Sequence, residues 1–433
     1  MAAGFLKYNR QNQYPDKVLV TGGNRIKGKI RIAGSKIASI PIIAATILSK
    51  QEITLENVPN LKDVRVLVYL INQLGGQTIW TKNTLKINNN DLRNLPLPAE
   101  VVTSVHGTIY LIPTLLARFG KVSIARSSGG CQIGERPIEH ILEVLRTLGA
   151  IVSMNGDEVI ATTTRLKGTS MSAQFSHGWD KFRSGTTKAF LLAGVGATGK
   201  SSLTDAYTRS SITELVRFLK VLGAKVTGEG TPNIEIIESV IGGGHFVLAG
   251  DYLEALTFVA CVAACGGELT IEGFDVSHCE AELRLFQEMG LTLEYKSGRL
   301  TVKNECKALK PVAFTTSTID TDIQSIISAA LTTSCGQSNI KEVVWENRYG
   351  YVQELRKMGA NLRVDGNELT INGVNFLTGA SIHAEDLRAA AALLIAAAAA
   401  KGQSVVSGLS HLERGYCHLI KKLISINIDI QNK

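Results

Sequence analysis

One short stretch of the sequence combines a thiol with positive charge. In RSSGGCQIGERP, residues 126–137, Cys131 follows two glycines, and Arg126 and Arg136 each stand five positions away. Neighbouring cationic groups lower the pKa of a thiol below its reference value of about 8.5, which allows it to exchange a proton near neutral pH. The alternative is a cysteine that merely fills space, but such residues usually lie in apolar helices or strands, whereas this loop is basic.

Charged residues also stand just before, or within the first turn of, six apolar stretches. They are Lys36, His106, Lys181, Arg183, Asp251, Asp322, Asp386 and Arg388. If these stretches are helices, their unpaired amides and dipoles attract anions. The first three stretches offer bases and the last three offer acids, which predicts a cleft for phosphates or carboxylates. The alternative is helix capping, which we favour for Asp251 because aspartate is a common N-cap residue. Lysine is a poor cap, so Lys36 is harder to explain in that way.

The elements that carry these residues recur along the chain. Amphipathic patterns that end in Leu-Gly or Met-Gly place glycines at equivalent positions, and a sixth copy has asparagine there; these stops are Gly75, Gly149, Gly223, Gly290, Gly359 and Asn427. Glycine and asparagine tolerate the left-handed conformation that ends many helices. The spacing predicts six units of about 70 residues each.

A strand, a turn and a second strand are expected after most of these helix stops. AIVSMNGDEVIAT, LTLEYKSGRLTV and ANLRVDGNELTI carry the NG, SG and DG signals of hairpins. The last unit has only IDIQNK before the sequence ends, and we predict that KVLVTG near residue 17 supplies its missing partner.

Each unit also contains a second helix that is apolar on nearly all sides, and such helices are buried. We therefore predict an α/β protein with two domains of three units each, with helices inside and sheets outside. The predicted first domain is 36–241, and the second is 1–35 plus 242–433.

Composition narrows the function. Seven cysteines without a CxxC pair, and no signal-peptide pattern at residues 1–17, favour a reducing cytoplasm. The longest apolar run, 389–400, is shorter than the roughly 20 residues that span a bilayer. A net charge of +8 is scattered rather than clustered, which favours small anionic ligands over nucleic acid.

Two local patterns are expected to be structural. GVGATGKS, residues 194–201, matches the phosphate-loop pattern, but a helix is predicted before it and a strand after it, which is the reverse of what that motif requires. Cys261 and Cys265 have no nearby partner ligands for a metal, so we assign them to a core helix.

Several segments together resemble the enolpyruvyl transferases, in particular those that use UDP-N-acetylglucosamine. They are AGSKIASIPI, SGGCQIGERP, TIDTDIQ, WENRYGYVQEL, AEDLRAAAALL and HLERGY, which follow in the family's order from about residue 17 to the C-terminus. The resemblance implies a two-domain inside-out α/β barrel of six repeats. It also implies transfer of the enolpyruvyl group of phosphoenolpyruvate to the 3-hydroxyl of UDP-N-acetylglucosamine, with release of phosphate, in peptidoglycan precursor synthesis.

The same resemblance implies roles for individual residues. Cys131 would be the general acid that protonates the methylene carbon of phosphoenolpyruvate, and would be the site alkylated by fosfomycin. Asp322 would take the proton of the acceptor hydroxyl. The groups that hold phosphoenolpyruvate would be Lys36, Arg136, Arg348 and Arg414. Those near the acceptor would be Ile37, His106, Arg136, Lys181, Arg183, Ser184, Asp322 and Val344, with Asp386 and Arg388 in support. No metal or organic cofactor is expected, because the enol phosphate is itself the activated donor.

The sequence departs from the family on the acceptor side. Ile37 stands where asparagine is usual, His106 stands where arginine is usual, and Arg183 and Ser184 occupy the stretch that lines the uridine. Three hypotheses therefore remain open: transfer to UDP-N-acetylglucosamine, transfer to a different nucleotide or sugar acceptor, and a non-catalytic paralogue that binds a UDP-sugar.

Overall fold

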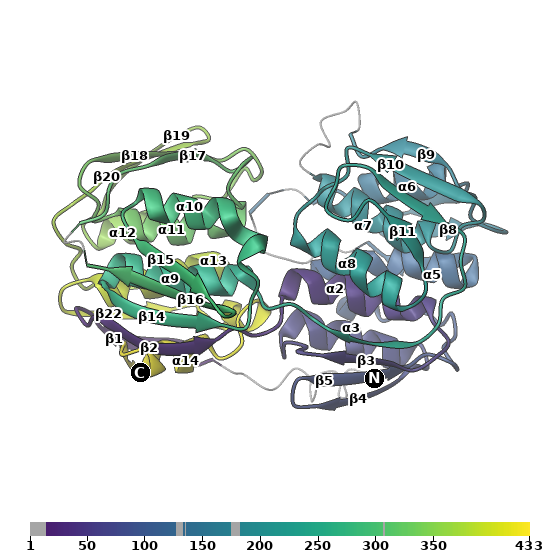
Figure 1. Cartoon of the computed structure of the whole chain (residues 1–433), viewed down its shortest axis with the longest axis horizontal. Coiled ribbons are helices and arrows are strands. Elements are labelled where there is room, and N and C mark those ends of the chain that lie inside the picture. Colours follow the sequence, from purple (N-terminus) through teal and green to yellow (C-terminus); the bar gives the residue numbers. More distant parts are fainter. Residues whose placement is uncertain (1–13, 127–132, 135, 175–181, 306–307) are drawn as a thin grey trace. The chain divides into compact units, whose positions relative to one another are not determined.

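The chain forms two compact units. The structure is a computed structural model that describes residues 14–126, 133–134, 136–174, 182–305 and 308–433. By their internal contacts, the first unit is built mainly from Gly34–Gly130 and Arg136–Ala249, and the second mainly from Arg10–Ala33 and Gly250–Lys433. Each unit is a mixture of helices and small sheets (Figure 1).

Three sheets belong to the first unit, within the residues that the structure describes. Listed by spatial order, they are β13(Gly244–Val247)-β3(Ile53–Glu56)-β5(Thr84–Asn88)-β4(Gln77–Thr81), β6(Lys121–Ala125)-β8(Glu158–Thr162)-β7(Ile151–Asn155), and β11(Lys225–Thr227)-β12(Ile234–Ile237)-β10(Lys200–Thr204)-β9(Ser170–Ser172). β3 and β10 each lie between one antiparallel and one parallel neighbour. β6 pairs only with β8 among the described strands, because the preceding segment contains Pro96 and Pro98, and proline cannot donate a ladder hydrogen bond.

The described part of the second unit also has three sheets. They are β15(Thr292–Lys296)-β16(Arg299–Asn304)-β14(Gly267–Glu272)-β2(Ile26–Arg31), β17(Ala313–Thr315)-β18(Gln337–Lys341)-β20(Glu368–Asn372)-β19(Asn361–Asp365), and β21(Ser381–His383)-β22(Gln403–Ser407)-β1(Lys17–Thr21)-β23(Asp429–Asn432). β14, β18 and β22 each have one antiparallel and one parallel neighbour. The N-terminal strand β1 pairs with the C-terminal strand β23, which confirms the predicted partnership of KVLVTG and IDIQNK.

Six helices carry the apolar stretches of the sequence and are largely buried. They are α2 (Lys36–Ala45), α5 (Leu111–Phe119), α7 (Arg183–Gly194), α9 (Tyr252–Cys265), α11 (Gln324–Leu331) and α13 (Leu387–Ala399). In the second unit α9, α11 and α13 pack against one another, and all of Leu387–Ala398 is buried. Burying each leucine or isoleucine there contributes about 1.5–3 kcal/mol, so these helices form the core of their unit.

Amphipathic helices flank the buried ones. They are α3 (Lys62–Gln73), α6 (Glu139–Thr147), α8 (Ser210–Val221), α10 (Glu280–Glu288), α12 (Tyr351–Lys357) and α14 (Leu419–Ser425). The helix stops that follow them all have positive φ, from 79° at Asn427 to 106° at Gly290. The predicted left-handed ends are therefore confirmed, and they explain why glycine or asparagine recurs there.

Other short-range predictions are also confirmed. β7–β8, β15–β16 and β19–β20 are the three predicted hairpins. GVGATGKS follows the end of α7 and leads into β10, so a helix precedes it and a strand follows it. None of the helices in the described part of the chain is long and apolar enough to cross a membrane.

Candidate active site

Lys36 is the first residue of α2 in the first unit. Ser35 caps this helix by accepting a hydrogen bond from the amide of Ala38 at 3.4 Å. A lysine at a helix N-terminus is disfavoured by the helix dipole, and here the Nζ atom lies 3.0 Å from the Oδ2 atom of Asp63. Asp63 is in the first turn of α3 and is only 4% exposed. The pair keeps the ammonium group in place at the beginning of a buried helix.

Two of the predicted acceptor residues in the described part of the first unit begin helices. His106 is the first residue of η2 (His106–Tyr110), and Arg183 is the first residue of α7. Ile37, His106, Arg136, Arg183 and Ser184 are all half-buried. They are therefore accessible on the surface of their own unit.

Lys188 is a cation that the sequence reasoning missed. It lies within the apolar helix α7, is 4% exposed, and donates a hydrogen bond from Nζ to the Oγ atom of Ser184 at 3.0 Å. The ammonium group also faces the ring of Tyr110, 5.7 Å from its centroid. A lysine that bonds a predicted acceptor residue adds positive charge to that part of the unit.

His140 lies nearby, on α6, and is 3% exposed. Its ring stacks on Phe182, with centroids 5.2 Å apart. Burial lowers the pKa of His140 to about 4, so the imidazole is neutral at physiological pH. Cys131 and Lys181, two further predicted site residues, lie outside the residues that the structure describes.

Asp322 is the centre of an ionic cluster in the second unit. It lies in η5 (Thr321–Ile323), and Asp320 caps this turn by accepting from the amide of Asp322 at 2.9 Å. The Oδ1 atom of Asp322 pairs with Arg348, and its Oδ2 atom lies 2.9 Å from Nη2 of Arg388. The arginine side chains are 3% and 5% exposed, whereas that of Asp322 is 29% exposed. The two buried guanidinium groups thus fix the carboxylate of Asp322, which itself remains partly exposed.

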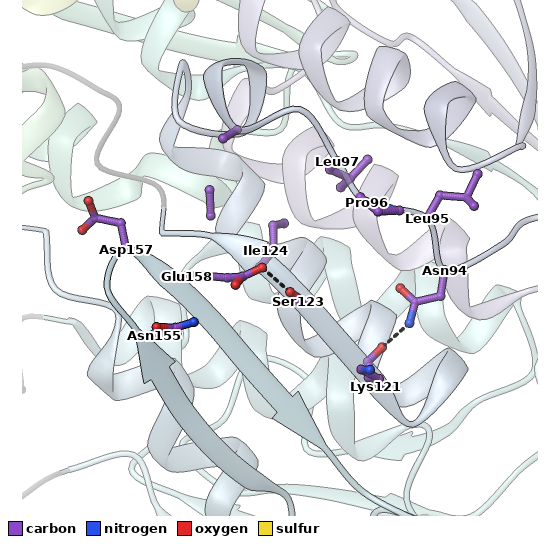
Figure 2. Close-up of a pocket in the computed structure, with 12 residues that line it drawn as sticks. Asn94, Leu95, Pro96, Leu97, Lys121, Ser123, Ile124, Asn155, Asp157 and Glu158 are labelled. Atoms are coloured by element: carbon purple, nitrogen blue, oxygen red, sulfur yellow. Dashed lines mark hydrogen bonds between the residues drawn. The ribbon is translucent and has the colours of Figure 1, made fainter.

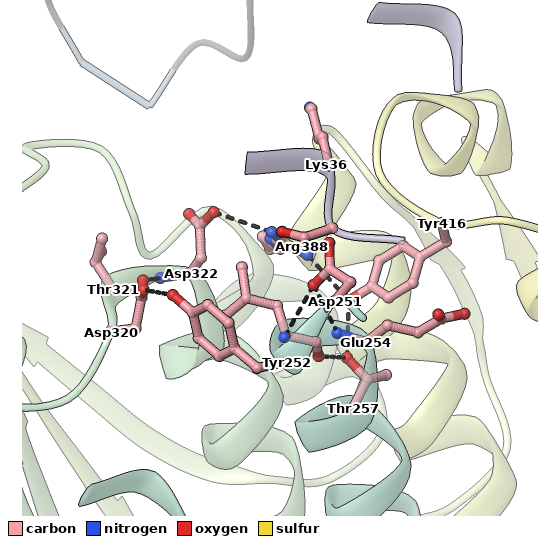
Figure 3. A network of polar contacts seen from close by, with 12 residues as sticks. Lys36, Asp251, Tyr252, Glu254, Thr257, Asp320, Thr321, Asp322, Arg388 and Tyr416 are labelled. Atoms are coloured by element: carbon pink, nitrogen blue, oxygen red, sulfur yellow. Dashed lines mark hydrogen bonds and ion pairs between the residues drawn. The ribbon is translucent and has the colours of Figure 1, made fainter. Parts of the chain in front are cut away.

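Arg388 links Asp322 to a buried hydroxyl network (Figure 3). Its Nη1 atom donates to the hydroxyl of Tyr416 at 3.2 Å, and that hydroxyl lies 2.8 Å from Oγ1 of Thr257 on α9. Burial alone would lower the pKa of Arg388, but the nearby charge of Asp322 outweighs it and raises that pKa well above its usual value. Arg388 therefore stays charged and keeps its hold on Asp322.

The remaining predicted residues lie at element ends. Asp386 caps α13 by accepting from the amides of Arg388 and Ala389 at 2.7 and 2.9 Å. Asp251 caps α9 by accepting from Leu253 and Glu254, so its expected capping role is confirmed. Arg414 is the last residue of η6 (Leu409–Arg414) and is half-buried. Val344 is half-buried in the loop after β18.

A cavity of about 650 Å³ lies elsewhere in the first unit (Figure 2). It is bounded by residues 94–97, β6 and the turn between β7 and β8. None of its lining residues is a predicted site residue. Among the described residues, no group of three or more His, Cys, Asp or Glu side chains is arranged to hold a metal ion.

Comparison with known proteins identifies the family of this chain. The model of EPSP synthase (3-phosphoshikimate 1-carboxyvinyltransferase) matches residues 20–423. The chain belongs to this family. It is therefore an enolpyruvyl (1-carboxyvinyl) transferase, and the resemblance seen in the sequence motifs is confirmed.

Curated relatives match this transferase from end to end. The UDP-N-acetylglucosamine 1-carboxyvinyltransferase of Lawsonia intracellularis is 35% identical over 421 residues, which cover 96% of this chain and 99% of that protein. The protein of the same name from Acinetobacter baylyi is 36% identical over 422 residues, with the same coverage.

Solved structures extend the comparison. The enolpyruvyl transferase NikO from Streptomyces tendae has a TM-score of 0.87 and 27% identity, and the match covers 96% of this chain and 99% of that one. An EPSP synthase from Acinetobacter baumannii, with a TM-score of 0.75 and 18% identity over 96% of this chain and 99% of its own, shares the fold. The fold is thus the mixed α/β fold of enolpyruvyl transferases.

Proposed function

We propose that the protein transfers the enolpyruvyl group of phosphoenolpyruvate to the 3-hydroxyl of UDP-N-acetylglucosamine and releases inorganic phosphate. The observation that carries this proposal is the end-to-end match, at 34–36% identity, to relatives that bear the name of this activity. The reaction would supply a peptidoglycan precursor for cell-wall synthesis in the cytoplasm.

Two groups would move protons in the addition step. Cys131 would donate a proton to the methylene carbon of phosphoenolpyruvate, which makes the adjacent carbon electrophilic. The acceptor oxygen would then attack that carbon while its proton passes to Asp322. The carboxylate of Asp322 suits this role because two buried arginines fix its position while its side chain remains partly exposed.

The product forms when the tetrahedral intermediate collapses. The methyl carbon would return its proton to the thiolate of Cys131, and phosphate would leave with the electrons of the broken C–O bond. Lys36, Arg136, Arg348 and Arg414 would stabilise the anionic donor and the departing phosphate, since guanidinium groups bind carboxylate and phosphate at two points. This scheme requires no metal or organic cofactor.

Acceptor binding would involve the predicted set of Ile37, His106, Arg136, Lys181, Arg183, Ser184, Asp322 and Val344, with Asp386 and Arg388 as supporting residues. We further propose that each of the two units is an inside-out barrel of three repeats. The regular left-handed helix ends support this repeat pattern.

A different acceptor is the second candidate. It is favoured by Ile37 and His106, which replace the usual asparagine and arginine, and by the contact between Lys188 and Ser184. NikO, which shares this fold, is named only as an enolpyruvyl transferase, so the fold by itself does not identify the acceptor. Under this alternative the donor chemistry is the same.

Phosphate release from phosphoenolpyruvate, measured against a panel of nucleotides, sugars and nucleotide sugars, separates the candidates. The proposal predicts release with UDP-N-acetylglucosamine alone. Release with another member of the panel would support the changed acceptor. Release with none of them, from protein that binds a UDP-sugar in calorimetry, would support a non-catalytic paralogue.

A further inference from the structure

Glu342 is a buried carboxylate with four hydrogen-bond donors and lies immediately after β18. It is 2% exposed. Its Oε1 atom accepts from Oγ1 of Thr316 at 2.9 Å and from the amides of Val344 and Trp345 at 2.8 and 3.1 Å. Its Oε2 atom accepts from Oγ1 of Thr321 at 2.8 Å. A buried carboxylate is costly unless its oxygens are satisfied, and these contacts satisfy both.

One side of this carboxylate fixes the loop that leads to Arg348. The amides of two consecutive residues, Val344 and Trp345, converge on Oε1. The amide of Val343 donates to the hydroxyl of Thr316 at 2.9 Å, and that hydroxyl in turn donates to Glu342. Two consecutive amides therefore bond Glu342 directly, and the amide before them is linked to it through Thr316, which restricts the backbone shortly before Arg348.

The other side of the carboxylate fixes the turn that carries Asp322. Thr321 donates its hydroxyl to Glu342, and its carbonyl accepts from Nε and Nη2 of Arg348 at 3.3 and 3.2 Å. The next residue, Asp322, pairs with the same arginine. Glu342 thus bonds both Thr321, whose carbonyl binds Arg348, and the 343–345 loop, which leads to Arg348 in the sequence.

We propose that Glu342 is the positioning residue that sets the geometry of Asp322 and Arg348. Glu342 acts on Asp322 and Arg348 indirectly. It bonds Thr321, the residue before Asp322, and the 343–345 loop, which leads to Arg348. The proposal rests on the roles of Asp322 and Arg348 proposed above. Small displacements of positioned groups are expensive, since an error of about 1 Å can cost about 100-fold in rate.

The chemistry of the four donors predicts a graded series of variants. In Glu342→Gln the amide oxygen can keep the three Oε1 contacts, and the Thr321 hydroxyl can reverse to accept from the new NH₂ group. We expect a loss of about fivefold in kcat/KM, because one contact is weakened. In Glu342→Ala all four contacts disappear, and we expect a loss of about 100-fold or more. Recovery by glutamine would show that hydrogen-bond geometry, rather than charge, is what the site requires.

Thr321→Val tests the arm that reaches Asp322, and Thr332→Val is its matched control. Thr332 is buried in the same unit, but its hydroxyl bonds only the carbonyl of Ala329, at the end of its own helix. We expect Thr321→Val to lower kcat about tenfold and to raise the KM for phosphoenolpyruvate about threefold, since both Asp322 and Arg348 move. Thr332→Val should leave both parameters as in the wild type.

The split between kcat and KM separates positioning from instability. A variant that is merely less folded has fewer active molecules, so its apparent kcat falls while the KM of the remaining active molecules is unchanged. Unchanged kcat and KM in Thr321→Val, or equal losses in Glu342→Gln and Glu342→Ala, would overturn the proposal. Asp322→Asn in the same assays isolates the underlying assignment: if that variant keeps full turnover, the role of Asp322 itself is wrong, whatever the Glu342 series shows.

Discussion

Lys36 and Asp322 occupy similar places in the two units but are held in opposite ways. Each stands at the beginning of a buried helix or of the turn that leads into one. Lys36 pairs with a carboxylate, that of Asp63, whereas Asp322 pairs with two guanidinium groups, those of Arg348 and Arg388.

The difference follows from the helix dipole. The positive end of a helix disfavours a lysine and favours an aspartate, so Lys36 requires a counter-charge whereas Asp322 does not. The two arginines at Asp322 therefore do not offset the helix dipole; they hold the carboxylate in place. Both guanidinium groups are buried, whereas the side chain of Asp322 remains partly exposed.

Removal of the Asp322 carboxylate should have the largest effect on this comparison. Asp322→Asn keeps the size of the side chain but cannot take the proton of the acceptor, so we expect turnover to fall about 1,000-fold. Steady-state kinetics at saturating substrates would measure it. Asp275→Asn is the matched control, because Asp275 caps η4 (Val276–Cys279) through Oδ1, an atom that asparagine retains. A loss of less than tenfold in Asp322→Asn would contradict the assignment.

Lys36→Ala should come next in size. It removes a preorganised positive charge that strengthens its interaction as the phosphate leaves, worth about 3 kcal/mol or roughly 100-fold in turnover. Lys200→Ala is a suitable control in the same unit, because Lys200 pairs with Glu235 at 2.6 Å on the exposed surface. If turnover at saturating phosphoenolpyruvate stays at the wild-type value, Lys36 is not catalytic.

Acid should weaken the first unit through His140. The pKa of this buried imidazole is about 4, below its reference value of 6.5, so between these values the unfolded chain binds more protons than the folded one. Its contribution to stability is complete above pH 6.5 and is lost as the pH falls toward 4, a difference of about 3 kcal/mol.

Denaturant unfolding at pH 7 and at pH 4.5 would show this effect. His140→Leu should have a smaller pH dependence than the wild type, whereas the exposed His383→Leu should keep the wild-type dependence. Equal pH dependence in the wild type and in His140→Leu would show that the imidazole is not held neutral by the fold.

The smallest expected effect concerns the acceptor side of the first unit. If Ile37 and His106 weaken sugar recognition, Ile37→Asn combined with His106→Arg should tighten binding of UDP-N-acetylglucosamine by about 1 to 3 kcal/mol, as regained hydrogen bonds typically do. Calorimetry on the double variant would measure the change. A loss of affinity would indicate that this part of the protein is built for another acceptor.

Local patterns in the sequence were sufficient to predict much of the fold. The left-handed residues at Gly290 and Asn427, the hairpins and the capping role of Asp251 all depend on a few neighbouring residues. The pairing of β1 with β23 joins the two ends of the sequence, but it was predictable because the last unit lacked a strand. That β6 has a single partner among the described strands was not predicted, although Pro96 and Pro98 are a signal for it.

The partners of the site residues were not predictable in the same way. Asp63 is distant from Lys36 in the sequence, and Glu342 is distant from Thr321. Neither pair is connected by a helical or strand periodicity. A signal did exist for Asp63, which is an acidic residue on the otherwise apolar face of an amphipathic helix. Lys188 gave a similar signal, as a charge within a buried helix. Buried charges of this kind are rare unless they are paired.

The identity of the product tests the central claim most directly. The protein would be incubated with phosphoenolpyruvate labelled with ¹³C at its second carbon and with UDP-N-acetylglucosamine, and the products would be identified by NMR and mass spectrometry. We predict a vinyl ether in which the labelled carbon is bonded to the 3-oxygen of the sugar, formed in equal amount to the phosphate released. Recovery of both substrates unchanged, or a labelled carbon bonded to any other oxygen, would contradict the proposed function.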